Sequence, residues 1–273
     1  MLRAFAEASI ALDRADFREA AIRNATFLLE KLRRPDGRLA HVWTAGRLGE
    51  PAFLDDLANL ADGLWALYGA TLDARWIDES LALADLAIAE FKSPDGPGFF
   101  DTSTAHEALI ARPRELQDGA TPSGNAVMAE LLLRFHAMTE RADYGLIAQQ
   151  ILESMVRPMS DQPVGFGRFL CATDLYLGPV REIAIAATTG DPEASAFAAT
   201  VARRYEPNAV IGLADPEQPT VTERFPFLQY RPLRNGQVAA YLCERHTCLP
   251  PVTTPPDLDR LLDEGVGVEW VSF

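Results

Sequence analysis

The chain has few positive charges for its length and no long apolar run. Its 273 residues contain 25 Lys and Arg against 39 Asp and Glu, which gives a formal net charge of −14. This excess of negative charge disfavours binding to nucleic-acid phosphates or to an anionic membrane surface. No stretch approaches the roughly 18 apolar residues that a transmembrane helix needs. The sequence therefore predicts neither a nucleic-acid nor a membrane partner.

Cysteine and histidine are also scarce, with three and four residues. Three cysteines do not make the disulfide framework of a small secreted domain, and the first residues lack a signal peptide's apolar stretch, so we expect a cytoplasmic protein. His41, His106, His136 and His246 show no metal-ligand spacing. There is no glycine-rich phosphate loop and no nucleophile elbow. The sequence predicts neither a metal nor a cofactor.

The N-terminal part contains a repeat of helical hairpins. An aromatic residue recurs near the start of three helical patterns, as Phe17, Trp76 and Tyr144. Apolar residues within the patterns fall at three- and four-residue spacing, and Pro-Asp-Gly follows two of them as a stop signal. The predicted pairs of helices are 2–12 with 17–33, 54–71 with 74–91, and 122–138 with 143–157.

Two long connections follow the second and fourth predicted helices, at 35–53 and 92–121. They contain the aromatic residues Trp43, Phe99 and Phe100. Connections of this length are usually functional or disordered. Because they repeat on the same end of successive hairpins, we expect them to form the rim of a cleft.

The pattern changes after about residue 178 to a small α/β arrangement. Strands are predicted at 181–186, 209–213 and 238–242, and helices at 192–205 and 258–263. The strand–helix–strand order at its start predicts a parallel pair of strands. Residues 214–236 are predicted to be irregular. The predicted organisation is a helical repeat domain over 1–178 and an α/β subdomain over 179–273.

Several runs resemble the family of proteins related to spermatogenesis-associated protein 20. They are Phe-Leu-Asp-Asp at 53–56, the specific run Asp-Gly-Ala-Thr-Pro-Ser-Gly-Asn at 118–125, and Cys243 with Cys-Leu-Pro-Pro-Val-Thr at 248–253. The resemblance covers nearly the whole chain. It implies a mainly α fold, a six-hairpin (α/α)6 toroid of the kind found in glycoside hydrolases and sugar epimerases.

The chain departs from that family in length. The family's N-terminal thioredoxin-like domain is absent, and so are about half of the toroid's hairpins. The resemblance therefore implies an incomplete toroid, either a truncated copy or one partner of a split protein. Exposed apolar helix faces in such a fragment predict self-association, or a second polypeptide that carries the missing toroid half and the thioredoxin-like domain.

Paired aspartates suggest carbohydrate chemistry in the predicted cleft. Glycoside hydrolysis needs one carboxylic acid and one ionised carboxylate on either side of the scissile bond. Asp56 and Asp118 are the predicted acid–base pair, with Asp55 beside them. A small carbohydrate is the expected ligand, for a hydrolase, an epimerase-like enzyme or a binding domain. The predicted substrate contacts are Asp62, Arg112, Ser123, Asn125 and Trp43.

Some of these residues also have a structural interpretation. Asp55 and Ser123 stand where helix caps are expected, and Arg112 is able to form an ion pair with Asp118. Cys243 and Cys248 lack the spacing of a thioredoxin motif and make only half of a zinc site, which leaves a reactive and a structural role open. The alternative function is a non-catalytic scaffold, or a redox-linked adaptor that works with a separate thioredoxin-like partner.

Overall fold

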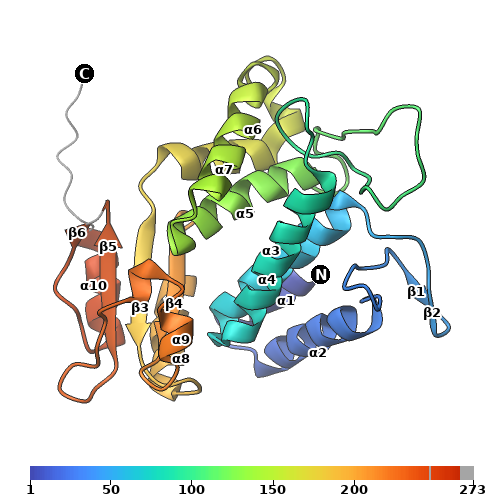
Figure 1. Ribbon diagram of the computed structural model, residues 1–273. Coiled ribbons are helices and arrows are strands. Elements are labelled where there is room, and N and C mark those ends of the chain that lie inside the picture. The colour runs from blue at the N-terminus through green and yellow to red at the C-terminus, as the bar shows by residue number, and fades with distance from the viewer. Residues whose placement is uncertain (246, 265–273) are drawn as a thin grey trace.

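The computed structural model describes residues 1–245 and 247–264, and it is mainly helical with a four-stranded sheet and a short two-stranded hairpin (Figure 1). Helical hairpins form the N-terminal part, followed by one further helix. The helices are α1 (Leu2–Ala11), α2 (Ala15–Lys31), α3 (Leu54–Thr71), α4 (Ala74–Phe91), α5 (Gly124–Thr139), α6 (Ala142–Asp161) and α7 (Gly167–Leu177), and a 3-10 turn, η1 (Pro163–Phe166), precedes α7.

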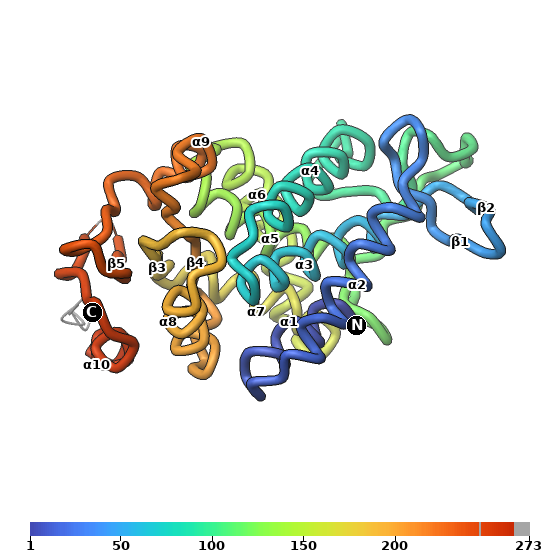
Figure 2. Tube along the Cα trace, turned by 90° about the horizontal axis from the view of Figure 1, so that it is seen from below, coloured from blue at the N-terminus to red at the C-terminus, as the bar shows by residue number. Residues whose placement is uncertain are grey.

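The odd-numbered helices form a continuous row, in which α1 contacts α3, α3 contacts α5, and α5 contacts α7. Each of α2, α4 and α6 packs against the odd-numbered helix that precedes it, so the row is backed by a second layer (Figures 1 and 2). Small residues such as Ala25, Ala58, Ala61 and Ala84 are fully buried between the helices. Alanine favours helix formation and lets neighbouring backbones approach closely.

The six helices predicted in hairpins are confirmed, with ends that differ by a few residues. Two details were wrong. The sixth helix does not end near Pro158 but continues to Asp161, because a proline near a C-terminal end removes only one backbone hydrogen bond. The connection at 35–53 is not structureless either, since it holds a short hairpin of β1 (Trp43–Thr44) and β2 (Arg47–Leu48).

The C-terminal part contains a four-stranded sheet with the order β4-β3-β5-β6. As predicted, β3 and β4 are parallel and joined by a helix, while β5 runs antiparallel to β3. The predicted irregular connection at 214–236 contains two short helical turns. The elements are β3 (Arg181–Ala186), α8 (Pro192–Ala202), β4 (Ala209–Ala214), α9 (Pro219–Thr222), η2 (Pro226–Leu228), β5 (Ala239–Glu244), β6 (Thr247–Cys248) and α10 (Pro255–Glu264).

The two faces of this sheet belong to different cores. Ala184, Val210 and Tyr241 lie in the same apolar cluster as the helical hairpins. Ile183 and Leu242 point to the other face, where α8 and α10 cover them. The alternation of side chains along each strand thus buries the sheet on both faces. One core extends across the predicted boundary at 178/179, and that boundary stays a prediction.

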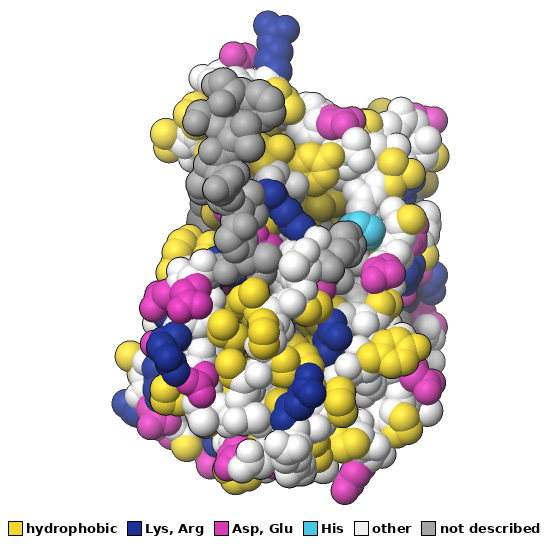
Figure 3. All heavy atoms as spheres, turned by 90° about the vertical axis from the view of Figure 1, so that its left-hand side faces the viewer, with side chains coloured by type: hydrophobic (Ala, Val, Ile, Leu, Met, Phe, Trp, Pro, Cys, Tyr) yellow, Lys and Arg dark blue, Asp and Glu magenta, His cyan; other side chains and the backbone are white. Residues whose placement is uncertain are grey.

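The surface at the sheet end of the molecule mixes apolar side chains with charges of both signs (Figure 3). Among the helices of residues 1–245 and 247–264, none is both long and apolar enough to cross a bilayer.

Candidate functional site

A cleft of about 480 Å³ opens where α3 and α5 begin. Its walls come from these two helix starts and from the connections at 35–53 and 92–121, as the sequence predicted. A helix start presents the positive end of the backbone dipole, which favours nearby carboxylates. The lining residues are His41, Phe53, Leu54, Asp55, Asp101, Glu115, Gln117, Asp118, Gly119, Thr121, Pro122, Ser123 and Gly124.

The start of α3 is fixed by loop contacts because its N-cap residue, Phe53, has no side-chain acceptor. The Leu54 N–H donates to the Asp101 carbonyl at 2.9 Å. The Phe53 N–H donates to Oδ2 of Asp56, also at 2.9 Å. Asp56 therefore satisfies a free backbone donor at the helix start, as the acidic residue of a capping box does.

The same oxygen of Asp56 holds a histidine at the edge of the cleft. His41 Nδ1 lies 2.7 Å from Asp56 Oδ2, and the imidazole is about half exposed. This hydrogen bond raises the pKa of His41. Burial raises the pKa of the Asp56 carboxyl, and this outweighs the opposing effect of its hydrogen bonds. With Nδ1 donating to the carboxylate, Nε2 is the ring nitrogen available to a ligand.

The carboxyl groups of Asp55 and Asp101 both face the cleft, but their surroundings differ. The Asp55 side chain is exposed, and its carboxylate has no hydrogen bond or ion pair among the described residues. Both oxygens of Asp101 accept the Glu115 N–H, at 3.0 and 2.9 Å. Burial raises the pKa of Asp101, and the negative charges of Glu115 and Asp55 raise it further. The cleft therefore pairs an unpartnered carboxylate with one whose charged form is disfavoured.

Asp118 lines the cleft, but its oxygens are occupied by backbone donors. Oδ1 accepts the Ser123 N–H at 3.0 Å, and Oδ2 accepts the Arg168 N–H at 2.8 Å. Through these bonds Asp118 joins the turn before α5 to the first turn of α7. Ser123 is buried, and its hydroxyl donates to the Glu115 carbonyl at 3.0 Å. Both residues hold the cleft wall in place.

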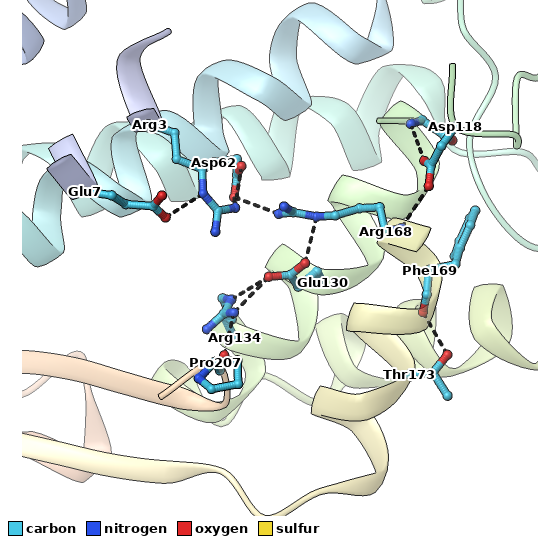
Figure 4. Close-up of polar contacts among 11 residues, drawn as sticks. Arg3, Glu7, Asp62, Asp118, Glu130, Arg134, Arg168, Phe169, Thr173 and Pro207 are labelled. Carbon is cyan, nitrogen blue, oxygen red and sulfur yellow. Dashed lines mark hydrogen bonds and ion pairs between the residues drawn. The ribbon is translucent and has the colours of Figure 1, made fainter. Parts of the chain in front are cut away.

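Asp62 lies outside the cleft, two turns along α3, in a partly buried chain of ion pairs (Figure 4). Arg3 Nη1 donates to both of its oxygens at 2.8 Å, and Arg168 Nη2 donates to Oδ1 at 3.1 Å. Arg168 also pairs with Glu130 at 2.7 Å, and Glu130 pairs with Arg134 at 2.8 Å. This chain connects α1, α3, α5 and α7.

The other predicted contact residues hold loops. The Asn125 side chain is fully buried, accepts the Phe99 N–H at 2.7 Å and donates to the Phe99 carbonyl at 3.0 Å. Arg112 stacks on Phe100, 4.3 Å from the ring centroid, and donates to the Thr102 and Glu90 carbonyls rather than to a carboxylate.

Trp43 packs edge-on against Phe27 at 5.7 Å and is not among the lining residues. Of the predicted site residues, the cleft brings together Asp55, Asp118 and Ser123, with Asp56 behind them.

The sequence is similar to that of curated proteins. Spermatogenesis-associated protein 20 of Homo sapiens is 32% identical over 212 residues, which is 77% of this chain. The protein of the same name from Mus musculus is 31% identical over 217 residues, or 78% of this chain. The chain is homologous to spermatogenesis-associated protein 20. It spans 27% of the length of each of these two relatives. No protein-family model matches the chain.

Sequence reasoning missed His41, Asp101 and Glu115 in the cleft. Histidines were considered only by metal-ligand spacing, and Asp101 and Glu115 stand in a connection without helical or strand periodicity. The available signal was position, because the connections at 35–53 and 92–121 both lead into helices of the cleft. Within the part of the chain that the structure describes, no group of three or more His, Cys, Asp or Glu is arranged to hold a metal ion.

Proposed function

We propose that the cleft binds and processes a carbohydrate, and that the two-layered helical array is part of an (α/α)6 toroid. The unpartnered carboxylate of Asp55, in one cleft with the His41–Asp56 pair, is the observation that carries this proposal. Carboxylates accept hydrogen bonds from sugar hydroxyls, and the ring of Phe53 offers an apolar surface to a sugar face. A volume of about 480 Å³ is in the range of small-molecule sites.

The proposed roles differ from the acid–base pair that the sequence suggested. His41 Nε2 is the proton-transferring group, and Asp56 positions it. Asp55 faces the substrate with a carboxylate that has no hydrogen bond or ion pair among the described residues. Asp101, whose pKa burial raises, is the second candidate acid. Asp118 is a positioning residue in this scheme, because both of its oxygens accept backbone hydrogen bonds. A histidine and a carboxylate suit epimerisation as well as hydrolysis.

A thermal-shift titration with a panel of mono- and oligosaccharides tests the proposal. A sugar that binds only the folded protein raises the unfolding midpoint by mass action. We expect a saturable rise for the wild-type chain that Asp55→Asn abolishes. Asp36→Asn changes an exposed carboxylate outside the cleft lining and should bind as the wild type does. No shift with any sugar, from folded protein, would contradict the proposal.

Turnover distinguishes processing from binding. With a sugar that binds, His41→Gln should reduce hydrolysis or epimerisation at least tenfold while binding changes little, since the imidazole transfers a proton. Equal turnover in His41→Gln and wild type would rule out the role of His41.

One observation favours the alternative function, a redox-linked adaptor that works with a separate thioredoxin-like partner. Cys243 and Cys248 form a disulfide, and Cys248 is exposed.

The proposal also includes a partner surface on α7, where Leu170, Tyr176 and Leu177 are exposed. Sedimentation or size-exclusion measurements would show whether the chain self-associates, and Leu177→Glu should then reduce the association.

A further inference from the structure

A disulfide joins β5 and β6, the last two strands of the sheet. These strands lie at the opposite end of the molecule from the starts of α3 and α5, which line the cleft (Figure 1). Cys243 lies on β5 and Cys248 on β6, directly opposite each other in the register. Cys243 is 3% exposed, whereas Cys248 is exposed. A reagent that approaches from solvent therefore meets the sulfur of Cys248 first, and Cys243 is the sulfur placed to leave.

A guanidinium group lies against this disulfide. Arg231 Nη2 is 3.3 Å from Sγ of Cys243 and 3.3 Å from Sγ of Cys248. The Arg231 side chain forms no ion pair with a carboxylate among the described residues, and its buried Nε has no hydrogen-bond partner there. Its guanidinium also lies over the ring of Tyr241, 5.4 Å from the centroid. Within the described part of the chain, Arg231 is thus a cation without an ion-pair partner, next to two sulfur atoms.

We propose that Cys243–Cys248 is an exchangeable disulfide that accepts electrons from a dithiol, and that Arg231 stabilises the thiolate released on reduction. A cation beside a sulfur favours the thiolate, and a better-stabilised thiolate leaves faster. Reduction supplies an anion beside Arg231, which has no ion-pair partner among the residues that the structure describes. The position of Arg231 is then explained by the reduced state, in which it pairs with a negative charge.

Thiol–disulfide exchange between the dithiol and Cys243–Cys248 proceeds in two steps. A thiolate of the dithiol attacks Sγ of Cys248, the S–S bond breaks, and its electron pair remains on Cys243, which leaves as a thiolate beside Arg231. The second thiolate of the dithiol then attacks the first sulfur of the dithiol, which is bonded to Cys248 in the mixed disulfide. Cys248 is released as a thiolate. The dithiol becomes a disulfide after giving up two electrons and two protons, and the protein holds two thiols.

The surrounding structure permits this exchange without global unfolding. β5 stays paired along its whole length with β3, whereas β6 pairs with β5 through only two residues. The backbone bond from the Leu249 N–H to the Leu242 carbonyl, at 2.9 Å, holds β6 beside β5 after reduction. A disulfide that closes so short a loop constrains the unfolded chain less than one that closes a long loop.

Dithiothreitol reduction under native conditions tests the proposal, with Cys171→Ser as the parent to remove the free exposed thiol. Thiols are trapped by alkylation and counted by mass. We expect full reduction in the parent, and a rate about 3- to 10-fold lower in Arg231→Ala and Arg231→Gln, because leaving-group acidity enters the exchange rate. Arg231→Lys keeps the charge and should retain most of the rate. Arg234→Ala is the matched control, since Arg234 faces the same Tyr241 ring without touching sulfur.

A pH profile separates thiolate stabilisation from a structural role. In the reduced parent, alkylation by iodoacetamide should show a midpoint below the ordinary thiol value of about 8.5. That midpoint should rise toward about 8.5 in Arg231→Gln and stay unchanged in Arg234→Ala. Reduction only at denaturant concentrations that unfold the chain would overturn the proposal. The same midpoint in Arg231→Gln and the parent would also overturn it. Neither result bears on the carbohydrate cleft.

Discussion

His41 Nδ1 lies 2.7 Å from Oδ2 of Asp56, an oxygen that also accepts the Phe53 N–H at the start of α3. One carboxylate oxygen therefore fixes both a helix start and the ring of the candidate proton-transfer group. The imidazole comes from a loop and the carboxylate from the first turn of α3. This bond therefore makes the position of His41 depend on the folded start of α3. The pair is accessible to direct measurement.

The pKa of His41 should be above 6.5 in the folded protein, since its hydrogen bond to Asp56 raises it. A pKa raised in the folded state stabilises the fold fully below the unfolded value of about 6.5, and this contribution is lost as pH rises through the folded value. Because His41 is about half exposed, solvent screening limits the effect to about 0.5 kcal/mol. NMR titration of the imidazole measures the pKa directly.

Asp56→Asn is the control for this titration. Without the carboxylate, the pKa of His41 should fall toward about 6.5. The difference in unfolding free energy between wild type and His41→Gln should be larger at pH 5.5 than at pH 9. A difference independent of pH would show that the hydrogen bond does not stabilise the charged imidazole.

Gly124→Ala should destabilise the cleft, because α3 and α5 start in direct contact. A Cβ atom at Gly124 would lie 3.2 Å from both Cα and N of Asp55, and 3.1 Å from Cγ of Leu54. The backbone of Asp55 has little room to move, so we expect a loss of about 1–3 kcal/mol in unfolding free energy, measured in urea. Gly119→Ala is the matched control in the same cleft, since its Cβ would meet nothing within 4 Å. Equal effects would contradict the packing argument.

The helical hairpins were predictable because each helix of a pair buries one apolar face. Such a face gives a clear periodicity of apolar residues at three- and four-residue spacing. α7 was missed, although Phe169, Ala172 and Leu175 are buried at three-residue spacing. Its short pattern follows a Gln-Pro and two glycines, which favour turns. The disulfide between Cys243 and Cys248 was not predicted, because it depends on β6 folding back onto β5.

The site was predictable in part, for a similar reason. Asp55 and Asp118 stand beside helix starts, and sequence marks such positions well. His41 and Asp101 depend on the paths of long connections, which are set by contacts such as the Asp101 N–H bond to the Pro113 carbonyl at 2.9 Å. Asp62 illustrates the limit of helical-face reasoning. It shares a face with Asp55 but lies two turns deeper, where it meets Arg3 and Arg168.

Asp62→Ala should cost much more stability than the loss of a surface ion pair. The Asp62 side chain is 8% exposed and pairs with both Arg3 and Arg168, so its removal leaves each partly buried arginine with one carboxylate, Glu7 or Glu130. We expect a loss of about 1.5–3 kcal/mol, read from urea unfolding. Arg157→Ala removes a highly exposed pair with Asp161 and should change the unfolding free energy by less than about 1 kcal/mol. A small effect of Asp62→Ala would mean that the ion-pair chain contributes little.

Asp118→Asn and Asp55→Asn should both weaken sugar binding, but only Asp118→Asn should destabilise the fold. In Asp118→Asn, one of the two acceptors for the Ser123 and Arg168 N–H groups becomes an NH2 donor, which leaves a backbone donor unpaired. We expect a loss of about 1–3 kcal/mol in unfolding free energy. Sugar binding should weaken as well, because the turn before α5, which forms part of the cleft wall, is held less firmly. Asp55→Asn breaks no hydrogen bond of the side chain among the described residues, so stability should change by less than about 0.5 kcal/mol while sugar binding is lost. Urea unfolding and sugar titration of both variants give the answer. Wild-type stability with abolished turnover in Asp118→Asn would restore Asp118 as a catalytic acid or base, because a purely positioning carboxylate cannot be lost without loosening the turn it holds.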